Sequence, residues 1–216
     1  MIYVTGDIHG DYDSLMDRPL GKLKKEDVLI VTGDFGFVWN NSNKEKSNLK
    51  KLSKKKYTIL FVEGAHENLE MIREFPEVEL YQAKGIKIAP NIYCLKRGEI
   101  YTIDGKSVFA LGGGLPPYED EPLEAPPSMP TDDELQYAVE NIQKHHRHVD
   151  LIITHEAPAS VKRMVDRSAT VNDLNIFLDT VLKNTRFGKW FFGALHRDRS
   201  VSDKLVCVFE DVHKIN

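Results

Sequence analysis

Short apolar segments that end in glycine, followed closely by an acidic residue or a histidine, recur along this chain of 216 residues. The first is Ile2-Tyr-Val-Thr-Gly-Asp-Ile-His-Gly10, in which Asp7 and His9 follow an expected buried strand. Residues two apart on an extended segment point to the same side, so these two side chains should leave the strand together. Such a carboxylate and imidazole are typical of a metal site, although a polar turn gives the same pattern.

The pattern recurs at four later strand ends. Asp34, His66, His155 and His196 follow the strands expected at 27–33, 57–64, 149–154 and 189–193. Helical segments separate the first strands, and this alternation is typical of an α/β fold with parallel strands. Because the carboxyl ends of parallel strands share one edge of a sheet, we expect these side chains to meet there.

The middle of the chain has a different pattern. Strands expected at 91–95, 99–103 and 106–111 are joined by short turns, so we predict a second, more antiparallel sheet. Prolines are frequent at 115–130, which we interpret as an ordered loop or flap over the site. Thr131 and Glu134 form a capping box that predicts a helix to about residue 148. We expect the whole chain, 1–216, to be a single domain.

Composition limits the class of protein. A net charge of −4 argues against a chain that holds nucleic acid or an anionic membrane by charge alone. Cys94 and Cys207 lie in separate apolar segments, which favours buried free thiols in a reducing compartment. No segment resembles a signal peptide or a membrane span. We therefore predict a cytoplasmic protein that does not bind membranes.

Taken in order, the strand-end motifs resemble those of the calcineurin-like metallophosphoesterases. The motifs are Gly6-Asp-Ile-His-Gly10, Gly33-Asp-Phe-Gly36, Gly64-Ala-His-Glu67, Thr154-His155 and Gly193-Ala-Leu-His196. The family has GDxHG, GDxx, GNH(D/E), a lone His after a strand, and GHxH at these places. The resemblance covers residues 2–196 and implies an α/β two-sheet sandwich flanked by helices. It also implies two divalent metals bridged by one aspartate.

Carried over to this sequence, the resemblance implies a ligand set for each metal. Asp7, His9, Asp34 and His196 would hold the first metal, while Asp34 and His155 would contribute to the second. His66 matches the catalytic histidine, which protonates the leaving oxygen or binds phosphate. Two such metals clamp a phosphoryl group and activate a hydroxide, and ligands of nitrogen and oxygen suit manganese, iron, nickel or zinc.

Two positions depart from the family pattern. Ala65 and Ala194 stand where the family has Asn and His, and both positions belong to the second metal. We therefore expect the second metal to bind weakly or not at all, and turnover to be severely reduced. The two alanines fit either a deliberately inactivated enzyme or a natural pseudo-enzyme that still binds phosphate or a nucleotide.

The substrate is expected to be a phosphorylated small molecule or a nucleotide, as a monoester or a diester. The longer motif GDxVDRG of the protein Ser/Thr phosphatases is missing after Asp34, which argues against a phosphoprotein. Trp39, with Phe37, could stack a nucleobase or could be an aromatic of the core or rim.

Phosphate also needs a cationic or hydrogen-bonding side chain. Arg197 follows His196 directly, and Arg97, Arg163 and Arg167 are further candidates for the phosphate site. Asn68 could bind a phosphate oxygen, but its position before a short helix favours a helix cap.

Overall fold

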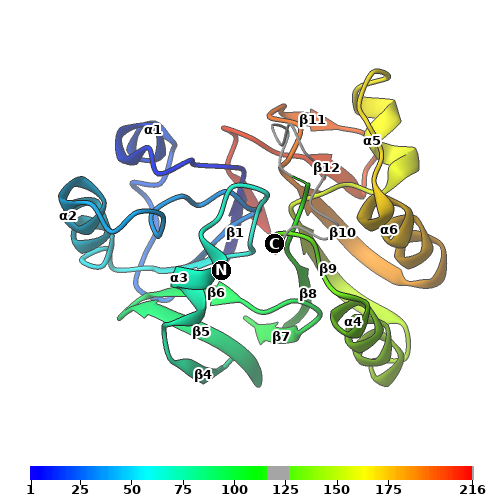
Figure 1. The fold of residues 1–216 in the computed structure, drawn as a ribbon, viewed down its shortest axis with the longest axis horizontal. Helices are drawn as coiled ribbons and strands as arrows, with labels where there is room; N and C mark the ends of the chain where they lie inside the picture. The colour runs from blue at the N-terminus through cyan, green and yellow to red at the C-terminus, as the bar shows by residue number, and fades with distance from the viewer. Residues whose placement is uncertain (116–126, 216) are drawn as a thin grey trace.

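The structure of the protein is a computed structural model that describes residues 1–115 and 127–215 (Figure 1). Two mixed sheets pack face to face, and helices cover the outer face of each sheet. This arrangement confirms the α/β two-sheet sandwich predicted from the sequence. Most of the proline-rich segment, interpreted above as a flap, lies outside the described residues.

The first sheet has the strand order β13-β1-β2-β3-β6-β5-β4. Its strands are β1 Ile2–Thr5, β2 Val28–Val31, β3 Thr58–Phe61, β4 Glu77–Leu80, β5 Ala83–Ala89, β6 Ile92–Leu95 and β13 His213–Ile215. The pairs from β1 to β6 are parallel, and the outer pairs are antiparallel. The sequence analysis did not identify β4 and β5, although Val78 and Leu80 alternate with charged residues as in an edge hairpin.

The second sheet has the strand order β11-β12-β10-β9-β8-β7. Its strands are β7 Ile100–Ile103, β8 Lys106–Leu111, β9 His148–Thr154, β10 Arg186–Phe192, β11 Arg199–Ser200 and β12 Leu205–Cys207. The expectation of a more antiparallel sheet is wrong, because the inner pairs β8–β9, β9–β10 and β10–β12 are all parallel. The strand expected at 91–95 is also not part of this sheet, because it is β6 of the first sheet and pairs parallel with β3. Helical crossovers join β8 to β9 and β9 to β10, and such crossovers return the chain in the same direction.

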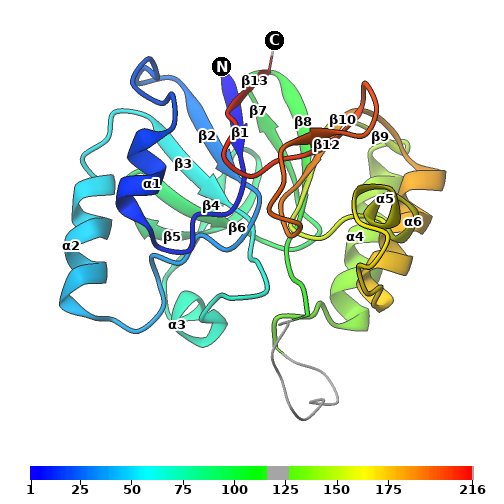
Figure 2. The same cartoon turned by 90° about the horizontal axis from the view of Figure 1, so that it is seen from above.

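Helices lie on both sides of the paired sheets, as Figure 2 shows. On the side of the first sheet are α1 Tyr12–Asp17, α2 Asn43–Leu52 and α3 Leu69–Arg73. On the side of the second are α4 Asp132–Lys144, α5 Ala159–Val165 and α6 Asp173–Asn184. The capping box of Thr131 and Glu134 is confirmed, but α4 ends at Lys144 rather than near residue 148. His146 and Arg147 adopt positive φ values that no helix continues through.

The alternation of buried side chains along the strands explains the layers. Val28 and Ile30 of β2 join an apolar cluster that also contains Leu151 and Ile153 of β9 in the second sheet. Their neighbours in β2 point the opposite way and pack under the helices of the first sheet. Each sheet therefore buries both faces, which explains why its central strands are apolar without interruption.

The last residues of the chain complete the first sheet. β13 pairs antiparallel with β1, with Ile2 opposite Ile215, so the two ends of the chain lie side by side in both views (Figures 1 and 2). The backbone N–H of Gly6 donates to the carbonyl of Phe209 at 3.1 Å. The C-terminal segment therefore contacts the turn that carries Asp7.

Both cysteines are buried with free thiols, as predicted. Among the described residues, none of the helices combines the length and the apolar character that crossing a membrane would require.

Candidate metal centre

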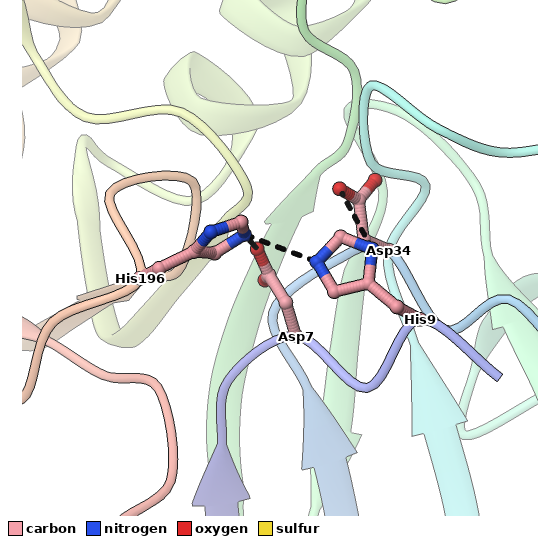
Figure 3. Close-up of side chains that lie close together, drawn as sticks. All are labelled: Asp7, His9, Asp34 and His196. Carbon is pink, nitrogen blue, oxygen red and sulfur yellow. Dashed lines mark hydrogen bonds and ion pairs between the residues drawn. The ribbon is translucent and has the colours of Figure 1, made fainter. Parts of the chain in front are cut away.

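Four side chains from distant parts of the chain meet beyond the ends of β1, β2 and β10 (Figure 3). Asp7, His9, Asp34 and His196 each place one ligand atom so that all four atoms lie within 4.8 Å of one another. Two carboxylates and two imidazoles offer oxygen and nitrogen ligands that suit a divalent transition metal. The predicted convergence of these residues is therefore present, but the expectation that they share the edge of one sheet is wrong. Asp7, His9 and Asp34 follow strands of the first sheet, whereas His196 follows β10 of the second.

The environment of Asp7 indicates a cation. Its side chain is buried, and neither carboxylate oxygen accepts a conventional hydrogen bond from the residues the structure describes. The nearest groups are imidazoles: Nε2 of His196 lies 3.0 Å from Oδ2, and Nδ1 of His155 lies 3.6 Å from Oδ1. A buried carboxylate that accepts no hydrogen bond of good geometry is costly unless a positive charge compensates it, so the residues fit a bound divalent metal.

The backbone conformation around the cluster differs from the extended segment that the sequence analysis expected at Asp7 and His9. His9, Asp34 and His196 have φ values of +52°, +42° and +48°, in the left-handed region that residues with side chains rarely adopt. Asp7 and His9 therefore converge through a turn rather than as neighbours on an extended segment. Backbone strain of this kind persists where the surrounding structure enforces it, and it is common at functional sites.

Glycines in the motifs leave space for the carboxylates. A Cβ atom on Gly64 would lie 1.9 Å from Oδ1 of Asp34, and one on Gly193 would lie 2.2 Å from Oδ1 of Asp7. No side chain fits at these distances without displacing the acid. The glycines at positions 64 and 193 are thus explained by the close approach of the backbone to the carboxylates of Asp34 and Asp7.

Arg18 and Glu67 hold the turns in place, and sequence reasoning assigned neither of them a role. The guanidinium of buried Arg18 donates to the carbonyl oxygens of Gly6 and Asp7 at 3.1 and 2.8 Å. Oε1 of buried Glu67 accepts the backbone N–H of Phe35 at 2.6 Å, next to Asp34. Glu67 stands in the recognised motif and could have been found there, whereas the sequence around Arg18 gives no comparable signal.

The charges of the cluster are strongly coupled. Burial opposes ionisation of Asp34, but the nearby imidazoles of His155 and His66 lower its pKa overall. Burial likewise opposes a charge on His155, but the carboxylates of Asp34 and Asp7 raise its pKa to about 10. The pKa of Glu67 is raised well above its usual value by burial and by Asp34. These shifts have in common that the carboxylates of Asp7 and Asp34 favour positive charge close to them.

His66 lies at the edge of the cluster with one nitrogen already engaged. Its Nδ1 lies 3.0 Å from Oδ2 of Asp34, and its backbone N–H donates to Oδ1 at 2.8 Å. The hydrogen bond with Asp34 raises the pKa of His66 even though burial opposes it. Nε2 is left as the nitrogen that can meet another molecule.

The surroundings of a second metal are poor in ligands. His155 is buried with its Nε2 3.9 Å from Oδ1 of Asp34, so these two residues do lie together. Ala65 and Ala194 are half-buried nearby, and the N–H of Ala194 donates to the carbonyl of His155 at 3.0 Å. Their side chains offer no donor atom, and the group of mutually close ligands excludes His155.

Of the four arginines predicted as phosphate ligands, one is buried and three are exposed. Arg97 is buried, and it forms ion pairs with Glu63 and Glu134, so its prediction as a phosphate ligand is wrong. Arg163 and Arg167 are exposed in and after α5. Arg197 is exposed beside His196, with its Nη2 3.4 Å from Asp166.

Asn68 and Trp39 lie on the other side of the site. Oδ1 of Asn68 caps α3 by accepting the N–H of Met71, which supports the interpretation as a helix cap. Its Nδ2 donates to the carbonyl of Trp39, so both ends of the amide are used within the protein. Phe37 is fully buried, whereas the side chain of Trp39 is exposed.

The fold is an α/β sandwich, and the cluster is a candidate divalent-metal site at the carboxyl ends of its strands. A family model for calcineurin-like phosphoesterases matches residues 1–198, and the chain belongs to this family. Comparison with curated proteins finds no match. The family membership implies divalent metals and the hydrolysis of phosphate esters.

Proposed function

We propose that this protein is a metal-dependent phosphoesterase in which Asp7, His9, Asp34 and His196 hold the first divalent metal. The observation that carries the proposal is the buried carboxylate of Asp7, which faces two imidazoles but accepts no hydrogen bond of conventional geometry from the described residues. When bound, the metal supplies positive charge that polarises a phosphoryl oxygen. Manganese, iron, nickel and zinc all suit these ligands.

The roles of the remaining residues follow from their contacts. Asp34 orients His66 through Nδ1, so that Nε2 can give a proton to the oxygen of the departing alcohol. Arg197, exposed beside His196, is the arginine best placed to contact phosphate. The substrate would be a phosphorylated small molecule or a nucleotide, since the net charge of −4 does not favour a polyanion.

Turnover by this sequence would be severely reduced. Only Asp34 and His155 remain for the second metal, because Ala65 and Ala194 have no donor atoms. Loss of partners that merely orient a ligand costs ten- to a hundredfold in metal affinity or activity, and loss of two ligands should cost more.

A metal titration followed by restoration of the two side chains tests the proposal. Calorimetry with Mn²⁺ should find one tightly bound ion per chain, and Ala65→Asn with Ala194→His should raise this to two. The same double variant should hydrolyse an aryl phosphate at least a hundredfold faster. Two tight ions in the unaltered protein would contradict the assignment of the second site. No metal binding by either protein would contradict the function.

The same two alanines also support a second candidate, a non-catalytic module that binds phosphate or a nucleotide. It predicts tight ligand binding with no turnover, even after Ala65→Asn and Ala194→His restore the ligands. A gain in rate would favour the enzyme, and it would also favour deliberate inactivation as the origin of the alanines.

A further inference from the structure

A cavity of about 380 Å³ opens directly beside the metal cluster. Its wall includes two histidines of the metal motifs, His9 and His66, together with Trp39, Lys44 and Asn48. This volume lies within the range of about 300–1,000 Å³ that is typical of small-molecule sites. The cavity is therefore large enough to hold a group attached to a phosphate at the cluster.

Trp39 is the most unusual residue of this wall. Trp39 is 46% exposed, whereas the other tryptophan of the chain, Trp190, is fully buried in β10 of the second sheet. An exposed indole ring lowers solubility and does not stabilise the core. An exposed aromatic side chain beside a site therefore indicates contact with a ligand.

The backbone that carries Trp39 is held rigidly. The carboxylate of Glu45 accepts the backbone N–H groups of Trp39 and Asn40 at 3.0 and 2.9 Å. From the other side, Nδ2 of Asn68 donates to the carbonyl oxygen of Trp39 at 2.6 Å. The indole is thus exposed on a fixed support, which lowers the entropy lost when a flat ring stacks on it.

Asn48 adds a polar group to the same wall. The residue is only 7% exposed, and its Nδ2 makes no hydrogen bond to any residue in the described part of the chain. Its Oδ1 has only one distant contact, with Nζ of Lys51 at 3.5 Å. An amide that lines the cavity beside an aromatic platform suits the edge of a heterocyclic base, because an amide both donates and accepts.

We propose that this cavity binds the base of a nucleotide substrate, stacked on Trp39 with its polar edge toward Asn48. The inference rests on the proposed function: His66 lines the cavity, so a group protonated by His66 would depart into it. The departing group is then the nucleoside of a nucleoside monophosphate. The P–O bond to the ribose breaks, and water supplies the new oxygen on phosphorus. The proton from His66 goes to the ribose oxygen, and the proton that the water loses passes to solvent, from which His66 is protonated again.

Binding measurements with the unaltered chain test the proposal without turnover. In the presence of Mn²⁺, AMP and CMP should quench the emission of Trp39, while buried Trp190 supplies a constant background. Ribose 5-phosphate, which has the same phosphate and sugar but no base, should bind more weakly and leave the emission unchanged.

Variants then separate the base from the phosphate. Trp39→Ala should weaken AMP binding about 5- to 150-fold in calorimetry, the range expected for one base stacked on an aromatic side chain, and leave ribose 5-phosphate unaffected. Trp39→Phe should retain part of the affinity. Asn48→Ala should reduce the difference in affinity between AMP and CMP. Met164→Ala, at an exposed apolar residue of α5, is the matched control and should change nothing.

The outcomes distinguish this inference from the proposed function. Equal affinities for AMP and ribose 5-phosphate that Trp39→Ala does not change would overturn the inference and leave the phosphoesterase proposal intact. If neither compound binds with Mn²⁺ present, and inorganic phosphate does not bind either, the proposed function itself fails.

Discussion

His9 and His196 bring their Nε2 atoms to 3.0 Å from each other, although the two residues are 187 positions apart in the sequence. Nε2 of His196 also lies 3.0 Å from the buried carboxylate of Asp7, and both imidazoles are exposed at the solvent side of the cluster. This geometry makes a direct prediction for metal binding. His196→Ala should lower the affinity for Mn²⁺ by more than about a hundredfold in calorimetry, because it removes a ligand rather than a supporting contact.

A histidine outside the cluster supplies the control for that measurement. His148→Gln alters an exposed side chain at the start of β9 and should leave the affinity for Mn²⁺ unchanged. Equal effects of the two substitutions would mean that the cluster is not where the metal binds.

Gly64 should be essential for the site although it carries no side chain. In Gly64→Ala the new methyl would lie 1.9 Å from Oδ1 of Asp34, so the carboxylate must move. We expect a loss of tight metal binding and a cost in stability of about 1–3 kcal/mol, as for other overpacked positions. Calorimetry and urea unfolding measure the two effects.

Gly21 offers a matched comparison for the same substitution. A Cβ atom there would meet no other atom within 4 Å, and its φ is not positive. Gly21→Ala should therefore bind metal normally. If Gly64→Ala also binds normally, the close approach of Gly64 to Asp34 has no functional consequence.

Glu67 should act by position rather than by charge. Glu67→Ala removes the acceptor for the buried N–H of Phe35, which should cost about 1–3 kcal/mol in the free energy of unfolding. Glu67→Gln keeps an acceptor oxygen, and it resembles the protonated carboxyl that the raised pKa favours. We therefore expect the glutamine variant to unfold at nearly the urea concentration of the unaltered protein. Equal destabilisation by both variants would contradict a positioning role.

Asp27 should make stability depend on pH at a place remote from the metal. The hydrogen bond from the N–H of Lys24 to Oδ2 of Asp27, at 2.7 Å, lowers the pKa of this carboxyl. Because its folded-state pKa lies below the unfolded value of about 3.9, the stabilisation is complete above that pH. It is lost as the pH falls through the folded-state pKa.

Asp27→Asn keeps the acceptor and removes the charge. The difference in unfolding free energy between the two proteins should be constant from about pH 7 to about pH 5.5 and should narrow at about pH 3. Urea unfolding at each pH measures it. A difference that stays constant down to the lowest pH would contradict an electrostatic origin.

The sequence predicted the central architecture because the central strands are buried on both faces. Continuous apolar segments such as those of β2 and β3 are readily recognised, and each ends in a motif glycine. The edge hairpin of β4 and β5 was missed because its strands are half exposed. The only sequence signal for such strands is the alternation of apolar and charged residues, not a continuous apolar segment. The strand directions predicted for the second sheet were wrong because helical crossovers, not hairpins, join β8 to β9 and β9 to β10.

For the site, the sequence predicted which residues meet but not how they are held. The positive φ of Asp34 and the hydrogen bonds of Arg18 to backbone carbonyls depend on tertiary packing, which no local pattern encodes. Arg97 illustrates the reverse error. An arginine suited to phosphate by chemistry alone is buried against Glu63, because pairing within the fold satisfies it first.

The pairing of β13 with β1 has a consequence for anyone who shortens this chain. A fragment that stopped at residue 198, where the family match ends, would still carry every candidate ligand. It would nevertheless leave the hydrogen-bonding edge of β1 bare and remove the carbonyl of Phe209 that restrains Gly6. Unprotected strand edges recruit other chains, so such a fragment should aggregate before its affinity for metal can be measured.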